Sequence, residues 1–373
     1  MKIALVHELL TMRGGAERVL RILAAMFPDA PIFALLYDEK KLGDWFPRER
    51  VRTSTIHPLF GSYNHHLYLR SFPRAVEAWD FSEFDLVIST SSAFAHGIIT
   101  NGKPKHLSII NSPARYLWDR THDVIREASH GPLGFLKKRY LQRIFHTLRI
   151  WDCEAADRPD TLLAASKTVQ RRIELYWRRT SDVVTPPIDD FWLQERKPIN
   201  EHMQRPDYFL IVSSLVRYKR IDLAIEACNK LGKYLKVVGE GSDMQRLKKL
   251  SGPTIEFYGW RQGDELADLY ASAIGTIFPG DEDFGLVPLE SMACGTPVIA
   301  YRSGGALETI VEGKTGEFFG DPTVEALQEV LVKFDSTKYS RDACREQARK
   351  FSQEKFKQEL SQKITEVMGG RVL

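Results

Sequence analysis

The stretch 274–305, IGTIFPGDEDFGLVPLESMACGTPVIAYRSGG, constrains the fold more than any other part of the chain. The apolar run Ile274 to Phe278 predicts a buried parallel strand, which a proline and a glycine end before the acidic turn 281–283. Leu289 to Ala293 then predicts a helix, and Pro297 to Tyr301 predicts a second buried strand. This order of elements is typical of an open parallel sheet, in which ligands bind at the carboxyl ends of the strands. The glycine loop between the first strand and the helix is therefore the first candidate site.

The groups around this glycine loop suit a phosphate. Backbone N–H groups at the start of a helix bind anions, because they lack intrahelical partners and lie at the positive end of the helix dipole. Glu282 and Glu290 flank the loop, eight residues apart. Because one lies at the strand end and the other lies inside the helix, both carboxylates are able to face one crevice.

A basic loop in the same half of the chain supplies positive charge. Arg217, Lys219 and Arg220 follow the predicted strand Tyr208–Val212 and precede the predicted helix Ile221–Leu231. Like charges packed this closely repel unless an anion neutralises them, and contacts to phosphate are a natural use. Taken alone, the cluster is better explained as solvated charges. Beside the glycine loop, at the same sheet edge, it predicts a shared phosphate site.

Strands and helices alternate in both halves of the chain, which predicts an α/β protein. We expect two doubly wound parallel-sheet (Rossmann-like) domains facing across a cleft. The double proline Pro186-Pro187 and the polar stretch after it mark the boundary between them. The predicted division is an N-terminal domain 1–190, a linker 191–207, a C-terminal domain 208–341, and a C-terminal helical segment 342–373 that caps the region between the domains.

Composition and charge narrow the class of protein. A net charge of +3 is too small to indicate nucleic-acid binding. The four cysteines form no CxxC pair, which predicts a reducing compartment and neither disulfides nor a zinc site. Since no run approaches the ~18 apolar residues of a membrane span, we expect a cytoplasmic protein, at most resting on the inner face of the membrane.

Two loops of the N-terminal half are candidate binding elements. Gly14-Gly15 lies between the first strand and a helix, where a glycine pair allows either a close ligand approach or merely a tight turn. It lacks the full dinucleotide-binding pattern, so we do not expect NAD. Asn111 and Arg115 follow another predicted strand. Arg115 either meets an anion at the sheet edge or pairs with Asp119.

The segment 133–151 predicts a basic amphipathic helix. It has an apolar stripe that includes Leu136, Tyr140 and Leu141, several lysines and arginines, and no acidic residue between Glu127 and Asp152. Such a helix is able to lie on an anionic membrane surface. The alternative is a helix that faces the core and exposes a solvated basic side.

The chain resembles the retaining glycosyltransferases of the GT-B fold, glycosyltransferase family 4, over essentially its whole length. The resemblance looks closest to O-antigen-type mannosyltransferases of polysaccharide biosynthesis. A lone pair of glutamates eight residues apart would be weak evidence, but its setting here is specific. The features that carry the resemblance are Gly14-Gly15, the 186–189 linker, Lys219, Glu282 and Glu290 within FPGDEDFGLVPLESMACGTPVIA, and Gly304-Gly305.

The resemblance implies roles for the matching positions. Lys219 would neutralise the diphosphate of a nucleotide-sugar donor, with Arg217 or Arg220 assisting. Glu282 would hold hydroxyls of the transferred sugar, and Glu290 would bond the ribose. The backbone amides of the loop would bind the sugar and the distal phosphate, and the glycine pair of the first domain would approach the diphosphate. These backbone positions are Phe284, Gly285, Leu286 and Val287 in the loop, and Gly14 and Gly15 in the first domain.

Two departures from the family pattern affect the assignment. Many relatives have arginine where this chain has Ser214, so Arg217 or Arg220 would have to substitute. Many also have histidine where this chain has Asn111, and asparagine cannot act as a base. His96 is the alternative candidate on the acceptor side, although a satisfied structural histidine is the favoured interpretation of this residue. The pair Asp281-x-Asp283 sits inside the glycine loop, so we predict no metal and no other cofactor.

The resulting functional prediction is a retaining hexosyltransferase. It would move mannose from GDP-mannose to a cell-surface glycan or a polyprenyl-linked saccharide. The alternatives are a UDP-sugar epimerase or a phosphorylase on the same fold, or a non-catalytic nucleotide-sugar-binding protein.

Overall fold

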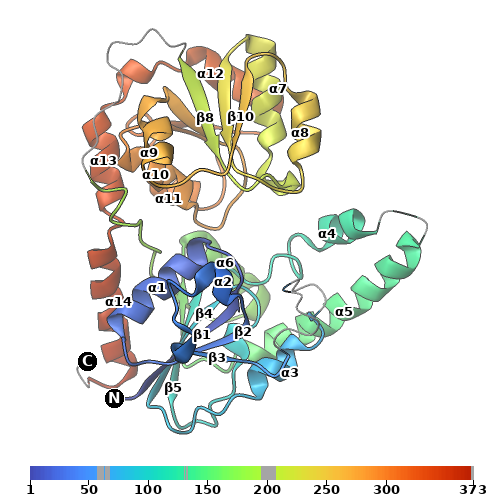
Figure 1. The fold of residues 1–373 in the computed structure, drawn as a ribbon, viewed down its shortest axis with the longest axis vertical. Coiled ribbons are helices and arrows are strands. Elements are labelled where there is room, and N and C mark those ends of the chain that lie inside the picture. The colour runs from blue at the N-terminus through green and yellow to red at the C-terminus, as the bar shows by residue number, and fades with distance from the viewer. Residues whose placement is uncertain (57–62, 64–67, 130, 132, 195–206, 371–373) are drawn as a thin grey trace. The chain divides into compact units, whose positions relative to one another are not determined.

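The computed structural model describes residues 1–56, 63, 68–129, 131, 133–194 and 207–370. The chain divides into two compact units, each built on its own sheet (Figure 1). The N-terminal unit contains Met1–Thr185 and Lys357–Leu373, and the C-terminal unit contains Pro186–Phe356.

The N-terminal unit has a seven-stranded parallel sheet in the order β3-β2-β1-β4-β5-β6-β7. The reversal of strand order between β1 and β4 is a topological switch point, where ligands bind in doubly wound sheets. The central strands are buried along almost their whole length, as apolar runs covered on both faces should be. The strands are β1 (Ile3–Leu10), β2 (Ile32–Tyr37), β3 (Val51–Thr53), β4 (Leu86–Ser91), β5 (Lys105–Ile110), β6 (Thr161–Ala164) and β7 (Asp182–Val183).

Helices of this unit pack on the sheet through apolar faces. One core cluster joins β1, β2 and β4 to α3 and α5, and a second joins β6 to α6. Ser166 caps α6, because its side chain accepts from the Val169 N–H at 3.0 Å. The helices are α1 (Gly15–Met26), α2 (Glu39–Leu42), α3 (Phe72–Glu77), α4 (Thr121–Ala128), α5 (Gly134–Ala155), α6 (Lys167–Trp177) and α14 (Gln353–Val367), with 3₁₀ turns η1 (Arg48–Arg50) and η4 (Ala95–Gly97).

The C-terminal unit has a six-stranded parallel sheet in the order β10-β9-β8-β11-β12-β13. Core clusters on its two faces include α7 and α12 on one side and α9, α10 and α13 on the other. The strands are β8 (Tyr208–Val212), β9 (Tyr234–Val238), β10 (Ile255–Gly259), β11 (Gly275–Phe278), β12 (Val298–Tyr301) and β13 (Gly316–Phe319). The helical elements are η5 (Arg217–Lys219), α7 (Ile221–Leu231), α8 (Met244–Leu250), α9 (Gly263–Ser272), α10 (Leu286–Ala293), α11 (Ala306–Thr309), α12 (Val324–Lys333), η6 (Ser336–Lys338) and α13 (Arg341–Arg349).

The structure differs from the predicted boundaries at the end of each domain. The division falls at Thr185–Pro186, because Ile188 and Trp192 are buried in the core of the C-terminal unit. Most of the predicted linker, 195–206, lies outside the described residues. The predicted C-terminal segment 342–373 consists of two helices, α13 and α14, and its residues from Lys357 onward group with the N-terminal unit.

No helix in the described parts of the chain is both long enough and apolar enough to cross a membrane.

A buried histidine gives the N-terminal unit a predictable response to pH. His106 on β5 is completely buried, its Nε2 lies 2.8 Å from Ser89 Oγ, and burial lowers its pKa to about 3. The unfolded chain takes up this proton near pH 6.5, while the folded chain does not. Stability attributable to His106 is therefore complete above pH 6.5, and it falls by about 1.4 kcal/mol per pH unit as the pH drops from 6.5 toward 3.

Between pH 6.5 and 5, the free energy of unfolding should rise less steeply with pH in His106→Gln than in wild type. The difference in slope should correspond to the uptake of about one proton on unfolding. The measurement is urea unfolding of wild type and variant at several pH values. His122→Gln, at an exposed position on α4, is the control that should leave the slope unchanged. Equal slopes for wild type and His106→Gln would contradict a neutral buried imidazole.

Candidate glycosyl-transfer site

The C-terminal sheet brings Lys219 and Glu282 together. Lys219 ends η5, which follows β8, and Glu282 follows β11, the neighbour of β8 in the sheet. Lys219 Nζ and Glu282 Oε1 form an ion pair, and their side chains are only 13% and 21% exposed. The strand ends meet closely here, because a Cβ built on Gly280 would lie 3.1 Å from Lys219 Cα. The structure thus joins the basic loop and the acidic turn at one edge of the sheet.

A second loop braces the acidic turn from the end of β12. Gly305 N–H donates to the Glu282 carbonyl oxygen at 2.9 Å, and Ser303 Oγ donates to Asp281 Oδ1 at 2.8 Å. Gly304 has φ of +62°, and a Cβ at that position would overlap the Glu282 carbonyl. The contact therefore requires glycine both for its backbone conformation and for its lack of a side chain.

We expect Gly304→Ala to lower the free energy of unfolding of the C-terminal unit by about 2–4 kcal/mol, through left-handed strain and overpacking. Urea unfolding measures the loss, and a donor-binding assay should show weaker binding. Gly320→Ala is the matched control, because a Cβ there meets no atom within 4 Å. If the two variants unfolded at the same urea concentration, the contact between Gly304 and the acidic turn would not stabilise the unit as we infer.

The start of α10 lies directly after this turn. The helix begins at Leu286, three residues before the predicted start at Leu289, and Gly285 caps it with φ of +85°. The amides from 284 to 287 are therefore at the N-terminus of an eight-residue helix, where the first N–H groups lack intrahelical partners. Phe284 is buried in the core of the C-terminal unit, and the side chains of Leu286 and Val287 pack against this core. Anchored in this way, the N-terminus of α10 is a suitable place for an anion.

Glu290 lies in the second turn of α10 and is nearly buried, with 5% of its surface exposed. Tyr270 of α9 donates its hydroxyl to Glu290 Oε2 at 3.2 Å. This contact orients the carboxylate within the unit before any ligand arrives.

The other residues of the basic loop have different surroundings. Arg220 adopts φ of +51° at the start of α7, and its Nε lies 3.4 Å from Asp222 Oδ1. Arg217 and Ser214 are exposed. Arg220 is thus engaged at its own helix start, and Arg217 is the more accessible of the two arginines.

In the N-terminal unit, the carboxyl ends of β1 and β4 meet around Glu8. Its Oε1 accepts from Ser91 Oγ at 2.8 Å and from the backbone N–H groups of Ser92, Ala93, Phe94 and Ala95 at 2.5–3.1 Å. Sequence reasoning missed Glu8, because its partners lie more than eighty residues away. The available signal was a charged residue within the apolar run VHELL, which implies a buried partner.

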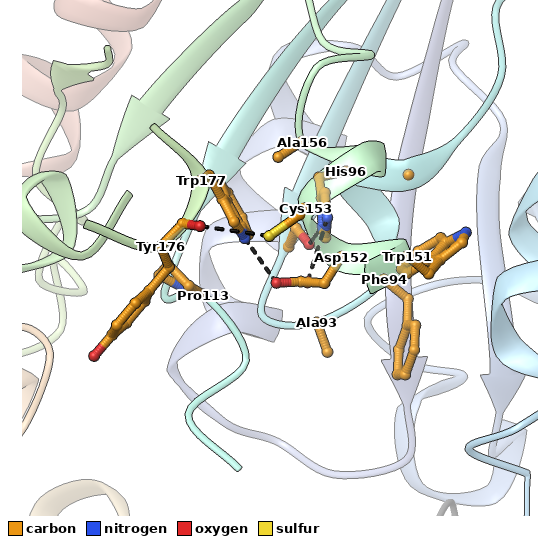
Figure 2. A network of polar contacts seen from close by, with 12 residues as sticks. Ala93, Phe94, His96, Pro113, Trp151, Asp152, Cys153, Ala156, Tyr176 and Trp177 are labelled. Carbon is orange, nitrogen blue, oxygen red and sulfur yellow. Dashed lines mark hydrogen bonds and ion pairs between the residues drawn. The ribbon is translucent and has the colours of Figure 1, made fainter. Parts of the chain in front are cut away.

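His96 belongs to a buried network rather than to an accessible acceptor site. Figure 2 shows it beside Asp152 and Trp177. Its Nε2 lies 3.5 Å from Asp152 Oδ1, and its Nδ1 lies 3.1 Å from Ser91 Oγ. Trp118 and Trp177 donate to Asp152 Oδ2 at 2.8 and 2.7 Å. Burial lowers the pKa of His96, although the nearby Asp152 carboxylate acts to raise it. Burial also raises the pKa of Asp152. Because His96 is completely buried, this placement corrects the prediction that it serves the acceptor side.

The remaining N-terminal candidates lie at the carboxyl edge of the sheet. Asn111 follows β5, and its side-chain amide lies 3.4 Å from Ser92 Oγ. Arg115 pairs with Asp119 at 3.0 Å, so of the two interpretations of this arginine the structure contains the ion pair. Gly14 caps α1, its N–H donates to Glu17 Oε2 at 2.9 Å, and Gly15 is exposed.

Among the described residues, no three His, Cys, Asp or Glu side chains form a cluster that could hold a metal ion. The absence of a metal or other cofactor from the reaction stays a prediction.

A known family matches most of the C-terminal unit. The family model for glycosyl transferases group 1 matches residues 194–351, which is less than half of the chain. The Lys219–Glu282 ion pair and α10 both lie within the matched segment.

The chain is similar to curated glycosyltransferases over part of their length. It is 25% identical over 203 residues to an uncharacterised glycosyltransferase of Methanocaldococcus jannaschii, covering 53% of this chain and 56% of that protein. It is 34% identical over 134 residues to the GDP-mannose-dependent alpha-(1-6)-phosphatidylinositol monomannoside mannosyltransferase of Mycolicibacterium smegmatis, covering 31% of this chain and 35% of that protein. The chain thus spans about half, or less, of these relatives' length.

A solved structure shares the fold over the whole chain. The two units match Anabaena HepE in complex with UDP-glucose, with a TM-score of 0.72 and 17% identity, covering 98% of this chain and 100% of that chain. At this identity the likeness shows the fold alone. The prediction of a GT-B fold with two parallel-sheet, Rossmann-like units is confirmed.

Proposed function

We propose that this protein is a retaining glycosyltransferase that moves mannose from GDP-mannose to a cell-surface glycan or a polyprenyl-linked saccharide. The observation that carries the proposal is the Lys219–Glu282 ion pair beside the N-terminus of α10, within the segment that matches the group 1 family model. The donor is supported by the similarity to a GDP-mannose-dependent mannosyltransferase.

The chemistry follows from the charges of this site. Transfer breaks the bond between the anomeric carbon and a phosphate oxygen, so negative charge develops on the leaving diphosphate. Lys219 and the amides of Phe284, Gly285, Leu286 and Val287 would stabilise that charge. The acceptor oxygen then bonds to the anomeric carbon on the same face, and its proton passes to the leaving phosphate.

Carboxylates of the site would hold the donor in place. Glu282 would bond hydroxyls of the transferred sugar, and its charge would favour an oxocarbenium-like centre. Glu290, already oriented by Tyr270, would bond the ribose. Arg217 is the arginine that we assign to assist Lys219, since Arg220 contacts Asp222. We assign Gly15 of the N-terminal unit to the donor diphosphate, and we assign Gly14, Asn111 and Arg115 to the acceptor side.

The test is a melting-temperature screen of the full chain against GDP-mannose, UDP-glucose and ADP-glucose. Ligand at about 100 times its dissociation constant stabilises the native state by about 2.7 kcal/mol, a rise of roughly 5–10 °C for a unit of this size. We expect this rise with GDP-mannose and its loss in Lys219→Ala. A rise with UDP-glucose alone would overturn the donor assignment.

Turnover separates the proposal from its alternatives. A transferase forms glycoside only with an acceptor, and NMR of the product should show the donor's anomeric configuration retained. Conversion of a UDP-sugar without acceptor would indicate an epimerase, and dependence on inorganic phosphate would indicate a phosphorylase. Stabilisation without turnover across a panel of acceptors would indicate a non-catalytic binding protein.

A further inference from the structure

The start of α5 exposes large apolar side chains that no core explains. Leu133, Phe135, Leu136 and Tyr140 are 67%, 64%, 52% and 58% exposed. Figure 1 shows α4 and the outer part of α5 projecting from the body of the N-terminal unit. We call α4 together with residues 133–143 the basic arm.

The apolar residues of this helix were predicted to form one stripe, but in the structure they lie on two different faces of α5. Leu141, Phe145 and Leu148 pack on the core of the N-terminal unit. Leu133, Leu136 and Tyr140, spaced by three and four residues, share a different face, because side chains three and four positions apart are neighbours on a helix. The first face accounts for folding and leaves the second without a function in the fold.

Positive charge surrounds the exposed apolar face. Lys137, Lys138, Arg139 and Arg143 are all exposed, and no acidic residue occurs between Glu127 and Asp152. The acidic residues on α4 are Asp123, which lies 3.7 Å from Arg126, and Glu127. The basic arm contains five lysines and arginines and two acidic residues, so its net charge is +3, equal to the net charge of the whole 373-residue chain.

We propose that the basic arm docks on the surface of an anionic lipid bilayer. Leu133, Leu136 and Tyr140 would insert at the boundary between headgroups and acyl chains, while the lysines and arginines pair with lipid phosphates. Charge complementarity favours this occupant. A tyrosine and leucines ringed by long basic side chains suit an interface that is apolar on one side and anionic on the other. A second copy of the chain would present the same positive charge and would repel.

The experiment is co-sedimentation of the full-length protein with vesicles of equal parts phosphatidylglycerol and phosphatidylcholine, without donor. Phosphatidylcholine vesicles and about 0.5 M salt are the comparisons. We expect binding to the anionic vesicles that falls steeply in high salt and on neutral vesicles. Because no sugar donor is present, the result is independent of the proposed transferase activity.

Two variants separate the contributions of charge and of apolar surface. Lys137→Glu/Lys138→Glu should weaken binding at least about 30-fold, as two basic residues near an anionic surface contribute about fivefold each. Leu136→Ser/Tyr140→Ser should weaken it at least about tenfold. The matched controls, Lys248→Glu/Lys249→Glu on α8 and Leu175→Ser on α6, change exposed residues elsewhere and should bind as wild type. Melting temperatures check that all variants fold.

The proposal would be overturned by absent binding to anionic vesicles, or by binding that the basic-arm variants and the controls weaken equally. It would also be overturned if the basic-arm substitutions changed the molar mass measured by light scattering without lipid. That result would make the exposed face an interface between copies of this chain.

Discussion

Lys219→Ala is expected to lower kcat for sugar transfer by about 10²–10³-fold, the usual cost of removing a group that stabilises charge developing in the transition state. Lys219 Nζ is held by Glu282 at the edge of the C-terminal sheet, so its charge is in place before the donor binds. Preorganised charge contributes more than charge recruited from solvent, since no reorganisation accompanies the reaction. The measurement is initial rate against GDP-mannose with a fixed acceptor, together with melting temperature to verify folding.

Glu282→Ala should reduce the same rate by a similar factor, because it removes the contact to the sugar and releases Lys219 from its position. A second ion pair of the same composition provides the control. Lys230 Nζ and Glu325 Oε1 lie 3.2 Å apart on the surface of the same unit, with side chains 53% and 70% exposed. Lys230→Ala and Glu325→Ala should leave kcat within about twofold of wild type, as exposed pairs contribute little. Near-wild-type rates in both Lys219→Ala and Glu282→Ala would defeat the assignment.

The elements of the C-terminal unit show how far sequence reasoning reaches. The bounds of β8 and α7 are those predicted, because a short apolar run and a helical stripe follow one another there and are separated by a charged loop. The start of α10 was misplaced by three residues, since Gly285 supplies a cap that the pattern of apolar residues alone does not locate. The strand β13 was not predicted, because its sequence Gly-Glu-Phe-Phe contains only two large apolar residues.

The candidate site was predictable where its residues follow neighbouring strands. Lys219 and Glu282 lie in the loops that follow β8 and β11, and parallel strands bring their carboxyl ends to one edge of the sheet. The surroundings of His96 and the two faces of α5 were not predictable in the same way. A helical period shows that a stripe exists, but the rest of the fold decides which part of it is covered.

Glu8 is a second consequence of strand order that sequence reasoning missed, and its removal should have the largest effect on stability. Because β1 and β4 are neighbours, the Glu8 carboxylate lies among the amides that follow β4 and accepts from Ser91 Oγ and four backbone N–H groups. Glu8→Ala leaves these donors without their acceptor in a buried place. We expect it to lower the free energy of unfolding of the N-terminal unit by about 3–5 kcal/mol.

Glu8→Gln and Glu83→Ala make this prediction specific to the buried carboxylate. Glutamine keeps an acceptor oxygen but loses the charge, so its cost should be smaller, roughly 1–2 kcal/mol. Glu83 makes the exposed ion pair with Arg52 at 3.3 Å in the same unit, and its replacement by alanine should cost less than about 0.5 kcal/mol. Urea unfolding measures the differences in the free energy of unfolding between these variants and wild type. Amide hydrogen exchange shows where the loss occurs, because the backbone N–H groups of residues 92–95 should exchange faster only in the Glu8 variants. If Glu8→Ala unfolded at the same urea concentration as Glu83→Ala, with exchange at 92–95 unchanged, Glu8 would not be what holds the loop after β4.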